Sequence, residues 1–193
     1  MSVNSGSGSK SGLVIVYTGE GKGKTTAALG ACYRALGYKH RCAIVQFIKG
    51  NNKTGESFFT EALTKMDYAN DQIDIHIHTL GRGFVFNHDD HLKNDDDLQA
   101  AKKAWEVATN LIMFEPRYDL VVLDEITYAF KYDFLNIHDA LSLFKKRHQS
   151  TSIVITGRNC PQAIIDYADL VTEMRMIKHP YEKGIAAIQG IDY

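Results

Sequence analysis

Residues 13–26 read LVIVYTGEGKGKTT and decide the fold class of this chain. The first five residues are an uninterrupted apolar run, which predicts a strand buried on both faces. Glycine occupies every second position of residues 19–23, and residues 24–36 then carry a helical pattern. We expect Gly37 to end that helix in the left-handed conformation. A strand, a glycine-rich loop and a helix in direct succession form the context of a phosphate-binding P-loop.

The residue types of this loop suit a polyphosphate. Its glycines let backbone N–H groups approach phosphate oxygens, and the helix N-terminus adds a positive dipole end. Lys24 supplies a point charge and Thr25 a hydroxyl for a metal ion. The usual motif, G-x-x-x-x-G-K-[ST], has glycine where this chain has Thr18, so the loop is one residue tighter. A turn that merely joins strand to helix is the alternative, but a GKTT helix start favours a nucleoside triphosphate site.

The rest of the chain alternates apolar strands with helices. Further strands are expected at residues 42–48, 73–78, 120–123, 152–156 and 170–174, and further helices at 55–65, 95–114, 137–146 and 161–168. This order predicts a single-domain α/β P-loop NTPase of the RecA-like kind, with a mostly parallel sheet covered by helices on both faces. Ligands bind at the carboxyl ends of such strands, so the loops after residues 17, 123 and 156 should share one rim.

Two more motifs fall on that rim. The strand LVVL is followed by Asp124 and Glu125, which resembles a Walker B element whose carboxylates hold Mg²⁺. Solvated acids at a strand end are the alternative. Arg158 follows the strand at 152–156, where a guanidinium can grip a phosphate bidentately. A surface arginine in a turn is an equally good interpretation of that triplet alone.

The amino-acid composition argues against nucleic acid as a partner and against a membrane-spanning helix. The chain has 193 residues, 45% of them hydrophobic, and 22 Lys and Arg against 23 Asp and Glu. Near-neutral charge gives no general case for nucleic acid, and no apolar run reaches the roughly 18 residues of a membrane helix. Residues 1–12 are expected to be a flexible Ser/Gly-rich tail before one domain at 13–193. Three widely spaced cysteines favour a reducing compartment, which we take as the cytoplasm.

Other polar clusters have simpler explanations than a metal site. His76 and His78 should share a polar strand face with Asp74, and the acidic stretch before residue 95 should favour a helix N-terminus. Phe84 and Phe86, flanked by glycines just past a strand, are either ordinary core residues or an apolar wall for a flat ligand.

The motifs together resemble a known family, the P-loop ATP:corrinoid adenosyltransferases, also called cob(I)alamin adenosyltransferases, of the CobA/CobO/BtuR type. The resemblance covers about residues 12–193. It is carried by the segments YTGEGKGKTTAALG, VQFIKG, VVLDEITYAFKYDFL, VITGRN and KHPYEKGIAAIQGIDY. The last of these is not a general P-loop feature, and the tight loop also belongs to this family.

The resemblance implies an activity and its partners. ATP would donate its 5′-deoxyadenosyl group to the cobalt of a reduced corrinoid and release triphosphate, in adenosylcobalamin biosynthesis or salvage. Mg²⁺ or Mn²⁺, a homodimer and a flavoprotein reductant (reduced flavin or flavodoxin) are also implied. In the family, ATP lies reversed relative to ordinary P-loop enzymes.

The resemblance also assigns site residues by position. The residues expected to bind ATP are Gly19, Glu20, Gly21, Lys22, Gly23, Lys24, Thr25, Thr26 and Arg158. Lys22, Lys24 and Arg158 would take the catalytic role of stabilising the departing triphosphate. Thr25, Glu125 and Asp124 would serve the metal. Phe84 and Phe86 align with aromatic residues that cover the lower face of the corrin, although the family commonly has Trp at the position of Phe86.

Two other functions fit the phosphate loop. A small-molecule kinase or NTPase would use Asp124 and Glu125 equally well, but the tight loop and the C-terminal segment count against it. An ATP-gated corrinoid carrier is compatible with the same site. A nucleic-acid-binding module is disfavoured because no basic, aromatic-rich stripe is present.

Overall fold

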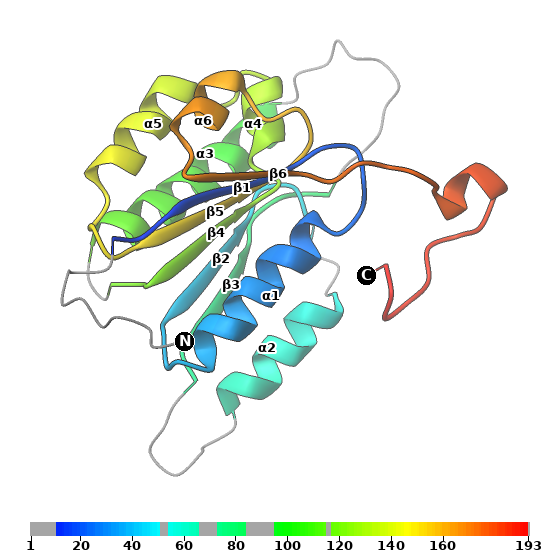
Figure 1. The fold of residues 1–193 in the computed structure, drawn as a ribbon, viewed down its shortest axis with the longest axis horizontal. Coiled ribbons are helices and arrows are strands. Elements are labelled where there is room, and N and C mark those ends of the chain that lie inside the picture. Colours follow the sequence, from blue (N-terminus) through cyan, green and yellow to red (C-terminus); the bar gives the residue numbers. More distant parts are fainter. Residues whose placement is uncertain (1–10, 51–53, 66–72, 84–94, 115–116, 193) are drawn as a thin grey trace, which may run out of the picture.

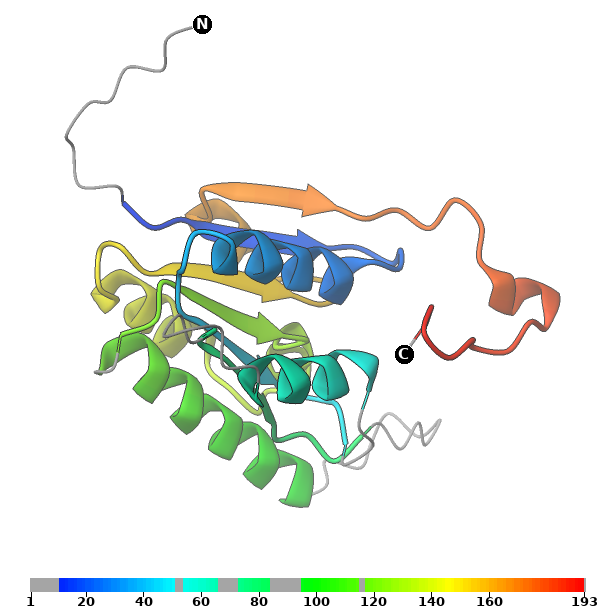
Figure 2. The same cartoon turned by 90° about the horizontal axis from the view of Figure 1, so that it is seen from below.

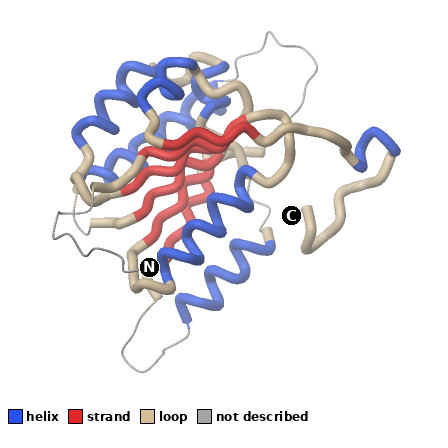
Figure 3. Tube along the Cα trace, in the orientation of Figure 1, coloured by secondary structure: helices blue, strands red, loops and turns tan. Residues whose placement is uncertain are grey.

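The strands form one six-stranded parallel sheet with the order β3-β2-β4-β5-β1-β6. The computed structural model describes residues 11–50, 54–65, 73–83, 95–114 and 117–192. The strands are β1 (Val14–Thr18), β2 (Cys42–Gln46), β3 (Ile75–Thr79), β4 (Leu120–Asp124), β5 (Ser152–Thr156) and β6 (Leu170–Glu173). Figure 3 shows the sheet between two layers of helix. The predicted α/β P-loop NTPase-like architecture is confirmed.

The direction of each crossover decides which face a helix covers. The helices are α1 (Lys24–Leu36), α2 (Gly55–Lys65), α3 (Asp95–Met113), α4 (Thr127–Lys131), α5 (Ile137–Lys146) and α6 (Gln162–Tyr167), followed by a 3₁₀ turn η1 (Pro180–Lys183). The chain passes from β1 to β2 to β3 in one direction and from β3 through β6 in the other. Because crossovers are right-handed, α1 and α2 cover one face, and α3, α5 and α6 the other (Figures 1 and 2).

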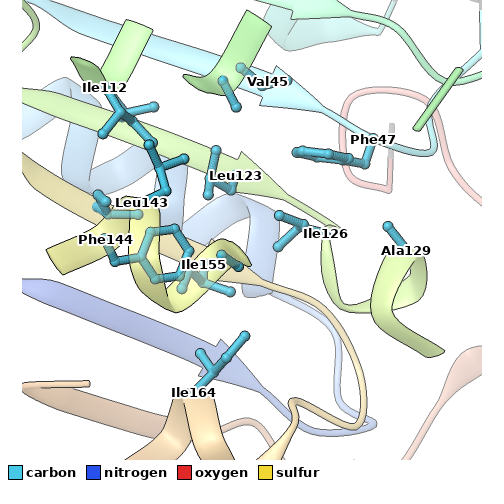
Figure 4. Close-up of a cluster of buried hydrophobic side chains, with 14 of the residues drawn as sticks. Val45, Phe47, Ile112, Leu123, Ile126, Ala129, Leu143, Phe144, Ile155 and Ile164 are labelled. Atoms are coloured by element: carbon cyan, nitrogen blue, oxygen red, sulfur yellow. The ribbon is translucent and has the colours of Figure 1, made fainter. Parts of the chain in front are cut away.

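Side chains that alternate along the strands build one core on each face. Val45, Leu123 and Ile155 point toward α3 and α5, where Phe144 is fully buried among them (Figure 4). The intervening residues of the same strands form a second core with the small buried residues of α1. Uninterrupted apolar strands are therefore explained by burial on both sides of the sheet.

The strand order brings the site motifs together. β5 lies between β1, which leads into the phosphate loop, and β4, which ends at Asp124. The loops after these three strands therefore lie side by side at the carboxyl edge of the sheet, where parallel sheets bind their ligands.

Local predictions were confirmed for most elements and wrong in two places. The bounds of α1, α2, α5 and β5 agree with the expected ones. Gly37 has φ −60°, so it does not end α1 in the left-handed region; Lys39 does so instead, with φ 60°. The cause is that the chain continues to turn, since Tyr38 N donates to Ala35 O and Lys39 N to Leu36 O. Helix α4 was not predicted.

Three further observations bear on earlier expectations. Cys32, Cys42 and Cys160 are all buried and free. Within the described ranges, no helix is long and apolar enough to cross a membrane. Gly12 is bound to the body of the protein, because its N–H donates to Gln149 O and its carbonyl accepts from Arg147. The boundary between tail and domain stays a prediction.

Candidate active site

The phosphate loop is shaped by the segment that follows β6. Gly19 and Gly23 have φ of 98° and 104°, a region that side chains disfavour. A Cβ atom at Gly19 or Gly21 would lie 2.5 or 2.7 Å from the carbonyl oxygen of Met174. Gly21 N donates to that same oxygen at 2.7 Å. Glycine is therefore required at both positions by a backbone neighbour, whatever the loop binds.

Lys24 is bound to the loop that it follows. Its Nζ donates to the carbonyl oxygens of Gly19 at 2.6 Å and of Gly21 at 2.5 Å. Burial and the Arg158 guanidinium lower the pKa of Lys24, while Glu20 and Glu125 oppose that shift. The ammonium group is thus held at the mouth of the loop by neutral acceptors, which leaves its positive charge available to an anion.

Two other predicted phosphate contacts have carboxylate partners in the structure. Lys22 forms an ion pair with Asp192, close to the C-terminus. Arg158 Nη1 lies 3.1 Å from Glu20 Oε2 across the loop. An arriving triphosphate would therefore have to compete with these two carboxylates for Lys22 and Arg158. Thr26, another predicted ATP-binding residue, is exposed in the first turn of α1.

The predicted metal residues Thr25 and Asp124 are in direct contact. Asp124 is fully buried, and its Oδ1 accepts hydrogen bonds from Thr25 Oγ1 at 2.9 Å and from Thr156 Oγ1 at 2.7 Å. Its other oxygen, Oδ2, has no partner among the described residues. Burying a carboxylate oxygen without a hydrogen-bond donor is energetically costly, and binding a cation through that oxygen would offset the cost.

Glu125 is held in an uncommon backbone conformation next to Asp124. Its φ is 60°, and its N–H donates to Thr156 Oγ1 at 2.8 Å. Burial raises the pKa of the Glu125 carboxyl to about 7, and the Asp124 carboxylate adds to the rise, against Lys49, Lys24 and Arg158. A cation beside both carboxylates would relieve this repulsion.

The Glu125 pKa predicts a pH-dependent stability of the metal-free protein. Its value of about 7 lies above the ordinary 4.5, so between these values the folded protein binds more protons than the unfolded chain. The stabilisation is complete below pH 4.5 and is lost as pH rises through about 7. Urea unfolding at pH 5 and pH 8 should show a smaller fall in the free energy of unfolding for Glu125→Gln than for the wild-type protein. An identical fall in both proteins would contradict the shift.

Several residues of the site were missed by the sequence analysis. Thr156 joins Asp124 to the backbone of Glu125, although the sequence suggests only a strand end there. Lys49 acts on the charge of Glu125 and forms an ion pair with Glu56 of α2. A lysine directly after an apolar strand was the available signal for Lys49, since that position falls on the ligand-binding edge.

The tight loop after β5 also depends on a residue that the sequence did not suggest. Gly157 has φ 138°, and a Cβ atom there would lie 1.9 Å from the hydroxyl oxygen of Thr127. Thr127, in α4, is buried. The glycine before Arg158 therefore lets the β5 and β4 loops approach each other closely.

The remaining candidates divide into two groups. Phe84 and Phe86 lie outside the described residues. His76 Nε2 lies 3.1 Å from Asp74 Oδ1, and His76 is exposed. Both residues lie at the amino end of β3, whereas the phosphate loop follows the carboxyl end of β1 in the same parallel sheet. Across the part of the chain that the structure describes, no group of three or more His, Cys, Asp or Glu side chains could hold a metal ion. A magnesium site with one or two carboxylates and substrate phosphates would not form such a group.

Comparisons with known proteins agree with the geometry. Residues 10–193 match the model of the family described as "ATP:corrinoid adenosyltransferase BtuR/CobO/CobP". A corrinoid adenosyltransferase of a Sinorhizobium species is 42% identical over 94% of this chain and 80% of its own length. The corrinoid adenosyltransferases of Escherichia coli K12 and Salmonella typhimurium are 35% and 36% identical, each over 94% of this chain and 86% of their own length.

Proposed function

The chain belongs to the ATP:corrinoid adenosyltransferase family, and on that premise we propose that it transfers the 5′-deoxyadenosyl group of ATP to the cobalt of cob(I)alamin or of a cobinamide-type precursor. The cobalt, as Co(I), supplies the electron pair of the new Co–C5′ bond. The C5′–O bond breaks, and its electron pair leaves with triphosphate. The corrinoid itself is the nucleophile, so the protein needs no nucleophilic side chain.

One observation carries this proposal, the position of the cations relative to the phosphate loop. Lys24 is bound to the loop carbonyls, and Arg158 lies across the loop from it. Both favour the charged form of Glu125, as expected of cations close to the metal carboxylates. A polyphosphate in this loop would therefore be stabilised as a departing anion. Orientation of C5′ toward cobalt would contribute about 7–11 kcal/mol more to lowering the barrier.

We further propose that Thr25, Asp124 and Glu125 hold Mg²⁺ or Mn²⁺. Their donors are all oxygens, which these ions prefer, and Asp124 Oδ2 lacks a partner among the described residues. When bound, the ion would neutralise charge on the phosphates. The chain's own part is to orient Asp124 through two threonine hydroxyls and to keep Glu125 next to it.

The corrinoid and the partners enter the proposal from the family resemblance. Phe84 and Phe86 would cover the lower face of the corrin in place of the lower axial ligand, which makes Co(II) easier to reduce. A flavoprotein or reduced flavin would supply the electron, and two chains would form a homodimer. The three free, buried cysteines support a reducing compartment such as the cytoplasm.

Product analysis tests the function. The protein incubated with ATP, Mg²⁺ and chemically reduced cob(I)alamin should yield light-sensitive adenosylcobalamin and intact triphosphate in equal amounts. ADP and phosphate without a cobalt–carbon product would instead indicate ordinary phosphoryl transfer.

The same assay tests the two phenylalanines. Phe84→Ala and Phe86→Ala should lose more activity with Co(II) plus reductant than with pre-reduced Co(I), because they are proposed to help the reduction step. Equal losses in the two assays would reject their redox role.

A further inference from the structure

Gln46 is a buried polar residue beside the metal carboxylates that the proposed function leaves without a role. It ends β2, is 1% exposed, and is the Cα partner of both Thr79 in β3 and Asp124 in β4. The preceding residue, Val45, packs toward α3 and α5 (Figure 4), so Gln46 points to the opposite, α1 side of the sheet. Asp124 points to the same side, where Thr25 of α1 reaches it.

Gln46 and Asp124 each have one buried polar atom without a hydrogen-bond partner among the described residues. Gln46 Oε1 accepts from Thr79 Oγ1 at 2.8 Å, which directs the amide oxygen toward β3. Gln46 Nε2 and Asp124 Oδ2 are both buried, and neither has a partner in the described parts of the chain. Two such groups on register-paired residues of one face are costly unless something joins them. A water oxygen can accept from the amide and donate to the carboxylate.

We propose that Gln46 is a positioning residue of the metal site. Its amide donates to a buried water that donates in turn to Asp124 Oδ2, so that Thr79, Gln46, this water and Asp124 form one hydrogen-bonded row across three strands. Thr25 and Thr156 hold the other oxygen of Asp124, and the row holds Oδ2 in the orientation that serves the metal. This role rests on the proposed function, because it needs a metal that accompanies ATP.

Calorimetric binding of ATP without corrinoid tests this role. The ratio of the ATP Kd in EDTA to the Kd in excess Mn²⁺ isolates the contribution of the metal. Gln46→Met keeps the approximate shape but removes the donor, and Thr79→Val removes only the group that orients the amide. Thr151→Val is the matched control, since Thr151 is also fully buried, at the other end of the sheet, and donates to Tyr118 O at 2.9 Å.

The expected results separate positioning from mere packing. Gln46→Met should lower the ratio about tenfold, as loss of a group supporting a metal ligand does, Thr79→Val should lower it less, and Thr151→Val should leave it within about twofold of the wild type. Metal-free Gln46→Met should melt about 3 °C lower than the wild type.

Two results would overturn the proposal. One is an unchanged ratio in both Gln46→Met and Thr79→Val, and the other is a higher melting temperature of metal-free Gln46→Met, because then no water joins the two buried groups. Should Gln46→Met fail to fold, Thr79→Val decides alone. A failure of the proposed function would show instead in the products made by the wild-type protein, which this binding measurement does not use.

Discussion

Replacing Lys24 with alanine is expected to lower kcat/KM for adenosyl transfer by a factor of about a hundred to a thousand. The Lys24 ammonium is held over the loop by the carbonyls of Gly19 and Gly21. In the proposed reaction it would meet the negative charge that develops on the leaving triphosphate there. Its charge is worth most in the transition state, so kcat should fall along with ATP affinity. Steady-state kinetics with pre-reduced cob(I)alamin, which removes the reduction step, measures the effect.

Lys103→Ala is the control for Lys24→Ala, because Lys103 is exposed on α3, on the other face of the sheet. It should retain near-normal kinetics, and circular dichroism should show both variants folded. Near wild-type kcat/KM in Lys24→Ala would refute its role in stabilising the leaving group.

Asp124→Asn is expected to abolish metal-dependent turnover, with kcat/KM down about a hundredfold or more, while the metal-free fold is kept or stabilised. The amide oxygen can still accept from Thr25 and Thr156, as the carboxylate does in the structure. The substitution removes a fully buried carboxylate whose negative charge raises the pKa of the neighbouring Glu125. Removing such a charge relieves its desolvation cost but takes away a ligand that a divalent cation needs.

Melting temperature and turnover should therefore move independently in Asp124→Asn. Differential scanning calorimetry in EDTA is expected to give a melting temperature equal to or above that of the wild type, and activity in excess Mg²⁺ should stay low. Asp139→Asn, on the exposed first turn of α5, controls for loss of a carboxylate elsewhere and should keep its activity. Full activity of Asp124→Asn would place the metal elsewhere.

Much of the fold could be predicted because its signals are local. The apolar run before residue 18, the glycine-rich loop and the helix that begins at Lys24 lie within a few residues of one another and agree with β1 and α1. The end of α1 could not be predicted as well, because hydrogen bonds past Gly37 moved the left-handed residue to Lys39. Helix α4 is only five residues long, too short for a periodic apolar pattern to stand out.

The site could be predicted in its residue types but not in its contacts. Lys24, Asp124 and Arg158 were expected on one rim, and the strand order places their loops together. That Lys22 and Arg158 have carboxylate partners could not be foreseen, because Asp192 is 170 residues from Lys22 in the sequence. Gln46 read as part of an apolar strand, and only its register with Thr79 and Asp124 shows that it lies beside the buried Asp124.

The amino-acid sequence alone determined the parallel α/β architecture, the phosphate loop and the family, because apolar periodicity, glycine spacing and motif order act over short stretches of chain. Only the tertiary structure decided which groups meet. Thr25 and Asp124, 99 residues apart, share a hydrogen bond because β5 separates β1 from β4 by one strand, and Met174 touches the phosphate loop because β6 pairs with β1. Strand order and register are set by the packing of the whole sheet, and no local pattern encodes them.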